Sequence, residues 1–101
     1  MSQARKDLEA YAKEWDLQVF EGHDECALQM DVDPDDARET CGGDIEAIAC
    51  YPDHVVFQVC AYIVNGTLYR FGIEMHGEDP GECHETSLKE LEALGDPHKR
   101  W

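Results

Sequence analysis

Two apolar segments joined by Asn65-Gly66 constrain the fold of this chain more than any other feature. Residues 54–64 (HVVFQVCAYIV) and 67–76 (TLYRFGIEMH) are rich in β-branched and aromatic residues, which favour strands. Asn-Gly suits a two-residue type I′ turn, which requires positive φ at both central positions. The sequence therefore predicts an antiparallel hairpin.

This hairpin predicts which side chains share a face. With Val64 opposite Thr67, alternate residues of the two strands point to the same side. The side chains expected on the core face are Cys60, Tyr62, Val64, Tyr69, Phe71, Ile73 and Met75. The opposite face is expected to be apolar on the first strand alone, through Val55, Phe57, Val59, Ala61 and Ile63.

Helices are predicted near both ends of the chain. Residues 4–15 carry apolar side chains at steps of three and four, which is typical of an amphipathic helix. Toward the C-terminus, Ser87 and Glu90 fit a capping box and Gly95 fits a helix stop. Residues 96–101 are expected to form a loose tail.

Further strands are predicted at residues 17–21, 26–32 and 45–51, and the second of these alternates cleanly between apolar and polar positions. The longest irregular stretch is expected at residues 77–85. The predicted architecture is an α+β fold with about five antiparallel strands and an N-terminal and a C-terminal helix. At 101 residues, 1–101 is expected to be a single compact domain.

The segment MDVDPDD at residues 30–36 places four carboxylates within six positions. Asp33 fits a helix N-cap, Pro34 fits a first helical position, and Asp35 and Asp36 fit the positive end of a helix dipole. A short helix or turn closed by a Gly-Gly pair is therefore expected here. Local structure can account for three of these four acids.

A calcium loop is the first alternative use of these acids. The spacing Asp31-x-Asp33-x-Asp35 resembles its start, but the motif requires Gly at the sixth position and Glu at the twelfth. This chain has Asp36 and Gly42 there. The sequence therefore predicts no metal and no cofactor at this segment.

The charge is strongly negative and uneven along the chain. Eight basic residues face 23 acidic ones, for a formal net charge of −15. Residues 31–53 hold one basic and eight acidic groups, a net of −7, whereas residues 54–76 hold one of each. Because nucleic-acid binders neutralise phosphates with clustered Lys and Arg, we expect no direct contact with nucleic acid.

The cysteine and histidine pattern supports few other functions. Five cysteines at irregular spacing are expected to be reduced. The N-terminus lacks the apolar core of a signal peptide and no apolar run is long enough to span a bilayer, so a cytoplasmic location is expected without membrane contact. Neither a nucleophile elbow nor a phosphate loop is present, so we do not expect an enzyme. A small zinc-binding or thiol-dependent protein is an alternative, built on His23, Cys26, Cys83 and His84.

These observations favour a non-enzymatic protein-binding inhibitor. Carboxylates two residues apart on a strand lie ~6.8 Å apart, about twice the rise per nucleotide of a DNA strand. The partner of this inhibitor would be a basic protein whose groove otherwise holds nucleic acid. In size and charge the chain resembles phage anti-CRISPR and anti-restriction proteins and toxin-immunity proteins, an analogy without a shared motif. The residues expected to bind the partner are Asp31, Asp33, Asp35, Asp36, Glu39, Asp44 and Glu46.

Two other interpretations stay open. The acidity could serve only solubility or adaptation to salt, although five cysteines and an aromatic hairpin disfavour salt adaptation. The chain could also form a homodimer through an apolar sheet face. The residues expected at that face are Val55, Phe57, Val59 and Ile63.

Overall fold

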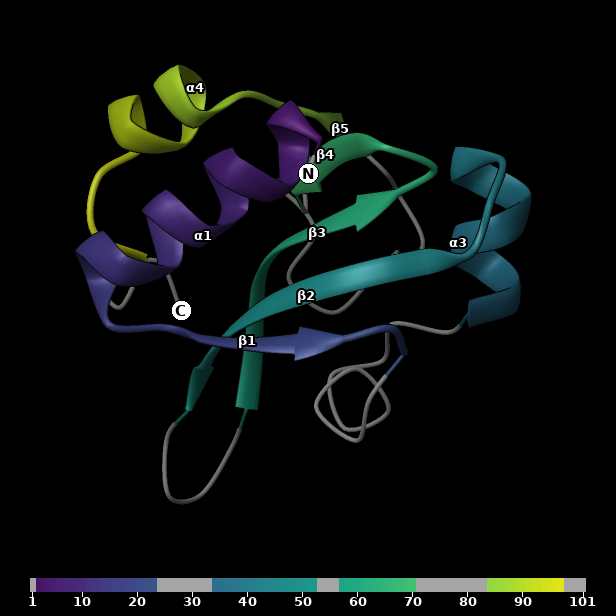
Figure 1. Ribbon diagram of the computed structural model, residues 1–101, viewed down its shortest axis with the longest axis horizontal. Coiled ribbons are helices and arrows are strands. Elements are labelled where there is room, and N and C mark those ends of the chain that lie inside the picture. The colour runs from purple at the N-terminus through teal and green to yellow at the C-terminus, as the bar shows by residue number, and fades with distance from the viewer. Residues whose placement is uncertain (1, 24–33, 53–56, 71–83, 98–101) are drawn as a thin grey trace.

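The computed structural model describes residues 2–23, 34–52, 57–70 and 84–97 (Figure 1). Its helices are α1 (Gln3–Trp15), α3 (Pro34–Cys41) and α4 (Leu88–Ala93). Its strands are β1 (Gln18–Glu21), β2 (Ile45–Pro52), β3 (Phe57–Val64), β4 (Thr67–Arg70) and β5 (His84–Glu85). The strands form an antiparallel sheet in the order β1-β2-β3-β4-β5, which confirms the predicted α+β fold.

The sheet contains one strand that the sequence did not predict. β5 lies within the stretch expected to be irregular, and it pairs with β4 through Arg70 opposite His84. The strand expected at residues 26–32 lies outside the described residues. The predicted strand count is therefore reached with a different set of strands.

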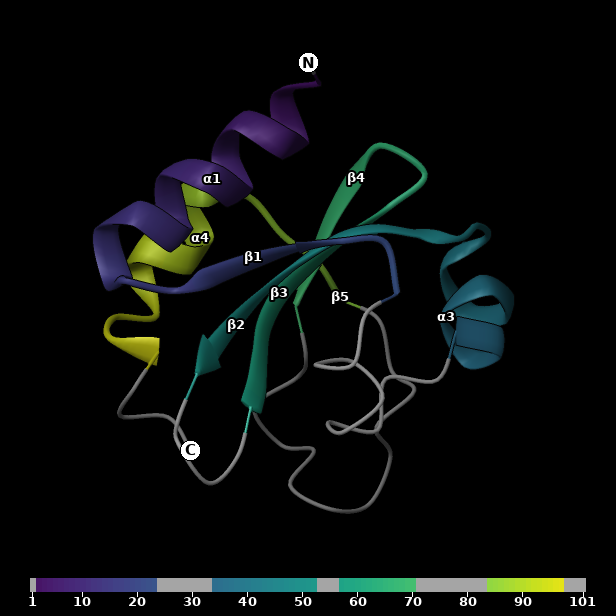
Figure 2. The same cartoon turned by 60° about the horizontal axis from the view of Figure 1, so that its bottom comes forward.

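Helices α1 and α4 lie side by side over one face of the sheet (Figures 1 and 2). Ser2 caps α1 by accepting a hydrogen bond from the Arg5 backbone N–H at 3.2 Å. The apolar side of α1 buries Leu8 and Tyr11, while α4 contributes Leu91. These side chains form one core cluster with the sheet residues Ala47, Ala49, Cys60, Ala61, Ile63 and Leu68.

The second face of the sheet is also buried, and it is the face that the sequence predicted as the core, because it carries Tyr62 and Val64 and packs against Tyr69. Its cluster contains Ile45, Ile48, Cys50, Val59, Tyr62 and Val64, each at most 6% exposed. Tyr62 stacks on Tyr69, with ring centroids 5.9 Å apart. The sheet therefore separates two cores.

The predicted faces of β3 are wrong at Val59 and Cys60. Ala49 pairs with Ala61 but the next residue, Cys50, pairs with Val59, so Cys60 is an extra residue in β3. Such a β-bulge shifts the alternation of side chains. Cys60 consequently packs under the helices, while Val59 joins Tyr62 on the other face. Phe71, Ile73 and Met75 lie outside the described residues.

The predicted turn between β3 and β4 is confirmed. Val64 pairs with Thr67, and φ is 51° at Asn65 and 76° at Gly66, as a type I′ turn requires. The chain leaving α3 passes close to this turn, because a Cβ on Gly43 would lie 3.0 Å from the Asn65 Cβ. Glycine at this position lets the two segments approach each other.

The capping residues expected for the C-terminal helix are present at α4. The Ser87 hydroxyl accepts a hydrogen bond from the Glu90 backbone N–H at 3.3 Å, and Gly95 follows the helix with φ 83°. The Glu90 carboxylate accepts from Thr86 at 3.1 Å, so it lies near the start of its own helix. Pro97, expected in a loose tail, is buried, and residues 98–101 lie outside the described part of the chain.

Candidate partner-binding surface

Four of the seven acids predicted to bind a partner lie at one end of the molecule. Asp35 and Glu39 are on α3, Asp44 is on the connection that follows, and Glu46 is on β2. Figures 1 and 2 show α3 beyond the start of β2, on the side away from α1 and α4. All four residues are exposed, and the side chains of Asp35 and Asp44 are 84% and 75% accessible. We call these four residues the acidic end.

The other three predicted acids have no described side chain. Asp31 and Asp33 lie outside the described residues, and Asp36 lies in α3 without a described side chain. The proposed spacing of carboxylates along a strand therefore stays a prediction. What the structure does describe is a helix and the turn after it.

Helix α3 presents its acids through ordinary helix signals. Pro34 is its first residue, a position where the missing N–H costs little. Gly42 follows the last helical residue with φ 83° and donates its N–H to the Arg38 carbonyl at 3.0 Å. Asp35 and Glu39 are four residues apart and so lie on one side of the helix.

Arg38 lies among the residues of the acidic end, although the sequence predicted no role for it. Its guanidinium contacts Asp35 Oδ1 at 3.0 Å and Asp44 Oδ1 at 2.7 Å through Nε. The hydrogen bond to Asp44 is the largest cause of a raised pKa at Arg38. Four acids and one base leave the acidic end with a net of −3. Only the spacing from Asp35 to Arg38, three residues apart on a helix, pointed to this pairing.

Glu46 has a structural role. It is the extra residue in β2, since Ile45 pairs with Val64 and Ala47 with Ile63. Its carboxylate accepts a hydrogen bond from the Gly66 N–H at 3.1 Å, and its carbonyl accepts from the Gly22 N–H at 2.8 Å. Glu46 therefore joins the hairpin turn to the end of β1.

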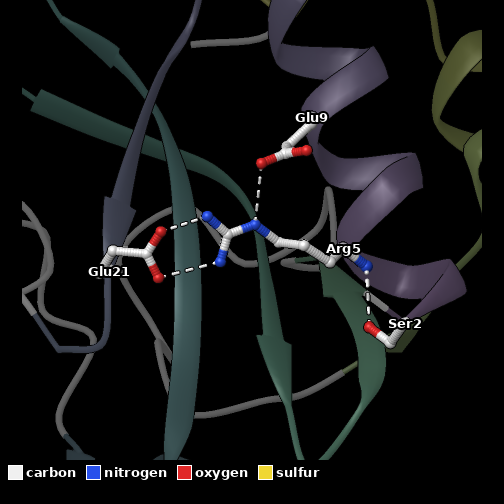
Figure 3. Close-up of polar contacts among 4 residues, drawn as sticks. All are labelled: Ser2, Arg5, Glu9 and Glu21. Atoms are coloured by element: carbon white, nitrogen blue, oxygen red, sulfur yellow. Dashed lines mark hydrogen bonds and ion pairs between the residues drawn. The ribbon is translucent and has the colours of Figure 1, made fainter.

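A second group of charges lies between α1 and β1 (Figure 3). The Arg5 guanidinium binds both carboxylate oxygens of Glu21 and donates from Nε to Glu9 at 3.2 Å. The hydrogen bonds from Arg5 lower the pKa of Glu21, and Glu21 in turn raises the pKa of Arg5. Two acids of this group are thus paired within the fold.

The structure does not bring the two histidines of the alternative zinc set together. His23 follows β1 at one edge of the sheet, and His84 lies in β5 at the other edge. Cys26 and Cys83 are outside the described residues. Within the described ranges, no group of three or more His, Cys, Asp or Glu side chains could hold a metal ion.

The prediction that all five cysteines are reduced is wrong. Cys41, at the end of α3, and Cys50, in β2, are both disulfide-bonded, whereas Cys60 is a buried thiol. Cys50 belongs to the cluster on the second face of the sheet, and Cys41 packs against that cluster. Cysteine spacing carries no information about which thiols the fold brings near one another, so the sequence could not predict these bonds.

The apolar face expected for a homodimer is not exposed as predicted. Val59 and Ile63 are each only 1% exposed, and the bulge at Cys60 places them in different core clusters. Val55 lies outside the described residues, and the Phe57 side chain is not described. Two of the four residues assigned to a dimer surface are therefore core residues.

Comparison with known proteins returned no match among family models, curated proteins or solved structures. Of the described helices, none is long and apolar enough to cross a membrane. The cytoplasmic location expected from the sequence stays a prediction.

Proposed function

We propose that this chain is a non-enzymatic inhibitor whose acidic end occupies a basic groove on a partner protein, one that otherwise holds nucleic acid. The supporting observation is the clustering of Asp35, Glu39, Asp44 and Glu46 on α3 and the start of β2. Exposed carboxylates on one end of a small domain steer a cationic partner toward that end.

The existing ion pairs modify this proposal in a specific way. Arg38 holds Asp35 and Asp44 in fixed positions, while Glu39 has no ion-pair partner among the described residues. A partner guanidinium or ammonium group can approach Glu39 directly and can replace Arg38 at the two aspartates. Exposed pairs contribute little to folding, so this exchange costs little.

An alternative without a partner is a surface that is acidic for solubility alone. On that interpretation, only the net charge matters and the position of each acid does not. The proposal requires the opposite, because a groove contacts one end of the molecule. Two variants with equal net charge therefore separate the interpretations.

The test compares neutralised variants of the purified protein. The first variant carries Asp35→Asn, Glu39→Gln and Asp44→Asn. The matched control carries Glu14→Gln, Glu85→Gln and Glu92→Gln, which are exposed residues of α1, β5 and α4. Each variant removes three negative charges, changing the formal net charge from −15 to −12.

Immobilised wild-type protein is used to capture partners from an extract of the native host across a salt series. An added oligonucleotide should release the captured protein, because the oligonucleotide and the acidic end compete for the same groove. Neutralising the acidic end should weaken the affinity for the captured protein on the order of 10- to 100-fold, while the affinity of the control variant stays close to that of wild type. Equal weakening by both variants would refute a local binding surface.

A further inference from the structure

Helix α3 carries half of the acidic end and is poorly equipped to hold itself in place. It has eight residues, and isolated helices shorter than ~12 residues are marginal in water. Its sequence, PDDARETC, contains only Pro34, Ala37 and Cys41 as apolar residues. Packing of an apolar face, the usual source of helix stability in proteins, is therefore limited here.

Cys41 is the described α3 side chain that packs on the core. It contacts the cluster on the second face of the sheet, while Asp35, Arg38 and Glu39 are exposed. Arg38 also pairs with Asp44, which lies after the helix, and such an exposed ion pair contributes little to stability. Cys41 is also disulfide-bonded, so a covalent bond fixes the C-terminal end of α3 in addition to this packing.

We propose that the disulfide at Cys41 fixes the C-terminal end of α3, so that the acidic end is formed in the oxidised protein and is lost on reduction. A dithiol reduces the bond by two successive exchanges: two electrons pass to the protein sulfurs, which take up two protons, and the reductant leaves as a cyclic disulfide. The binding-competent form then belongs in an oxidising compartment, in contrast to the cytoplasm expected from the sequence. This regulation rests on the proposed function, but its structural basis can be tested separately.

Hydrogen exchange on the full chain tests the structural basis. Oxidised protein is compared with protein treated with dithiothreitol, and intact mass confirms complete reduction. Amide exchange at the end of α3, including the Gly42 N–H that bonds to Arg38, should accelerate at least about tenfold, while β2 and β3 stay protected. Unchanged exchange in α3 would overturn the proposal, as would loss of protection throughout β2 and β3.

Two variants assign the effect to one cysteine. Cys41→Ser should show fast exchange in α3 without any reductant. Cys60→Ala changes a buried thiol that is not in a disulfide, and it should retain the wild-type response to reduction. If Cys41→Ser does not fold, reduction of the wild-type protein still decides the matter, and slow exchange in α3 after reduction would overturn the proposal.

Binding of a fluorescent oligoarginine peptide connects the disulfide to function. Oxidised wild-type protein should bind this peptide at least about tenfold more tightly than reduced protein. If oxidised wild type binds it no better than the Asp35, Glu39 and Asp44 variant does, the proposed function fails, and hydrogen exchange alone decides whether the disulfide positions α3. If the oxidised and reduced proteins bind equally while the acidic-end variant binds weakly, the redox proposal fails and the proposed function stands.

Discussion

Burial of Tyr62 on the second face of the sheet predicts a loss of stability in alkali. Tyr62 is 3% exposed and stacks on Tyr69. Desolvation, followed by the charge of Tyr69, raises the pKa of Tyr62 from 10.0 to about 12. A buried phenol resists losing its proton because the phenolate would be poorly solvated.

The sign and the size follow from proton linkage. The unfolded chain loses this proton near pH 10, whereas the folded chain keeps it until about pH 12. Unfolding therefore releases a proton in this window, and the free energy of unfolding falls as the pH rises. The contribution is intact below about pH 10, is reduced by about 1.4 kcal/mol at about pH 11, and is reduced by about 2.7 kcal/mol well above pH 12.

Urea denaturation at about pH 8 and about pH 11 measures this effect in wild type and in Tyr62→Phe. The variant lacks the titrating hydroxyl, so it should lose about 1.4 kcal/mol less than wild type between the two pH values. Using the difference between the two proteins cancels the titration of the other groups. If both proteins lose the same stability, Tyr62 is not desolvated, and the second core is not closed as described.

Two further predictions concern the attachment of the helices. Gly42→Ala should lower the free energy of unfolding by about 1–2 kcal/mol, measured by urea denaturation, because φ at Gly42 is 83°. The added Cβ itself meets no atom within 4 Å. An unchanged free energy of unfolding would contradict the described backbone conformation at the end of α3. Leu91→Ala should cost about 2–5 kcal/mol and lower the thermal midpoint, because Leu91 is the buried anchor of α4. A change below about 0.5 kcal/mol for Leu91→Ala is typical of an exposed site and would contradict that burial.

Features with a local signal could be predicted from the sequence. The Asn65-Gly66 turn, the Ser87 cap and the glycine after α3 each depend on residues within one or two turns of chain. Amphipathic spacing likewise placed α1, whose observed bounds differ from the prediction by one residue at its start. The fold class followed from these elements.

Features that depend on tertiary pairing could not be predicted. β5 has two residues, too few for a pattern, and it is defined only by its pairing with β4. The bulge at Cys60 leaves no trace in the alternation of an apolar segment, so the faces of β3 were assigned wrongly there. No local signal pairs Arg5 with Glu21, which lies 16 residues away.

The candidate site likewise has features that the sequence could predict and features that depend on tertiary contacts. Charge counting located the acids, because net charge by segment needs no structure. It could not show that Arg38 neutralises part of the acidic end or that Glu46 supports a turn. These contacts depend on how α3 returns to the sheet through Gly42 and Gly43.

The polarity of α3 connects the proposed function to the proposed regulation. A helix that presents carboxylates to a partner has few positions left for apolar side chains, so its own packing is weak. Another link must then hold it, and Cys41 provides one at the position where the helix ends. A protein with a larger apolar face on α3 would not need the disulfide, and its binding would not respond to reduction. The proposed dependence of this surface on oxidation is therefore a consequence of its acidity.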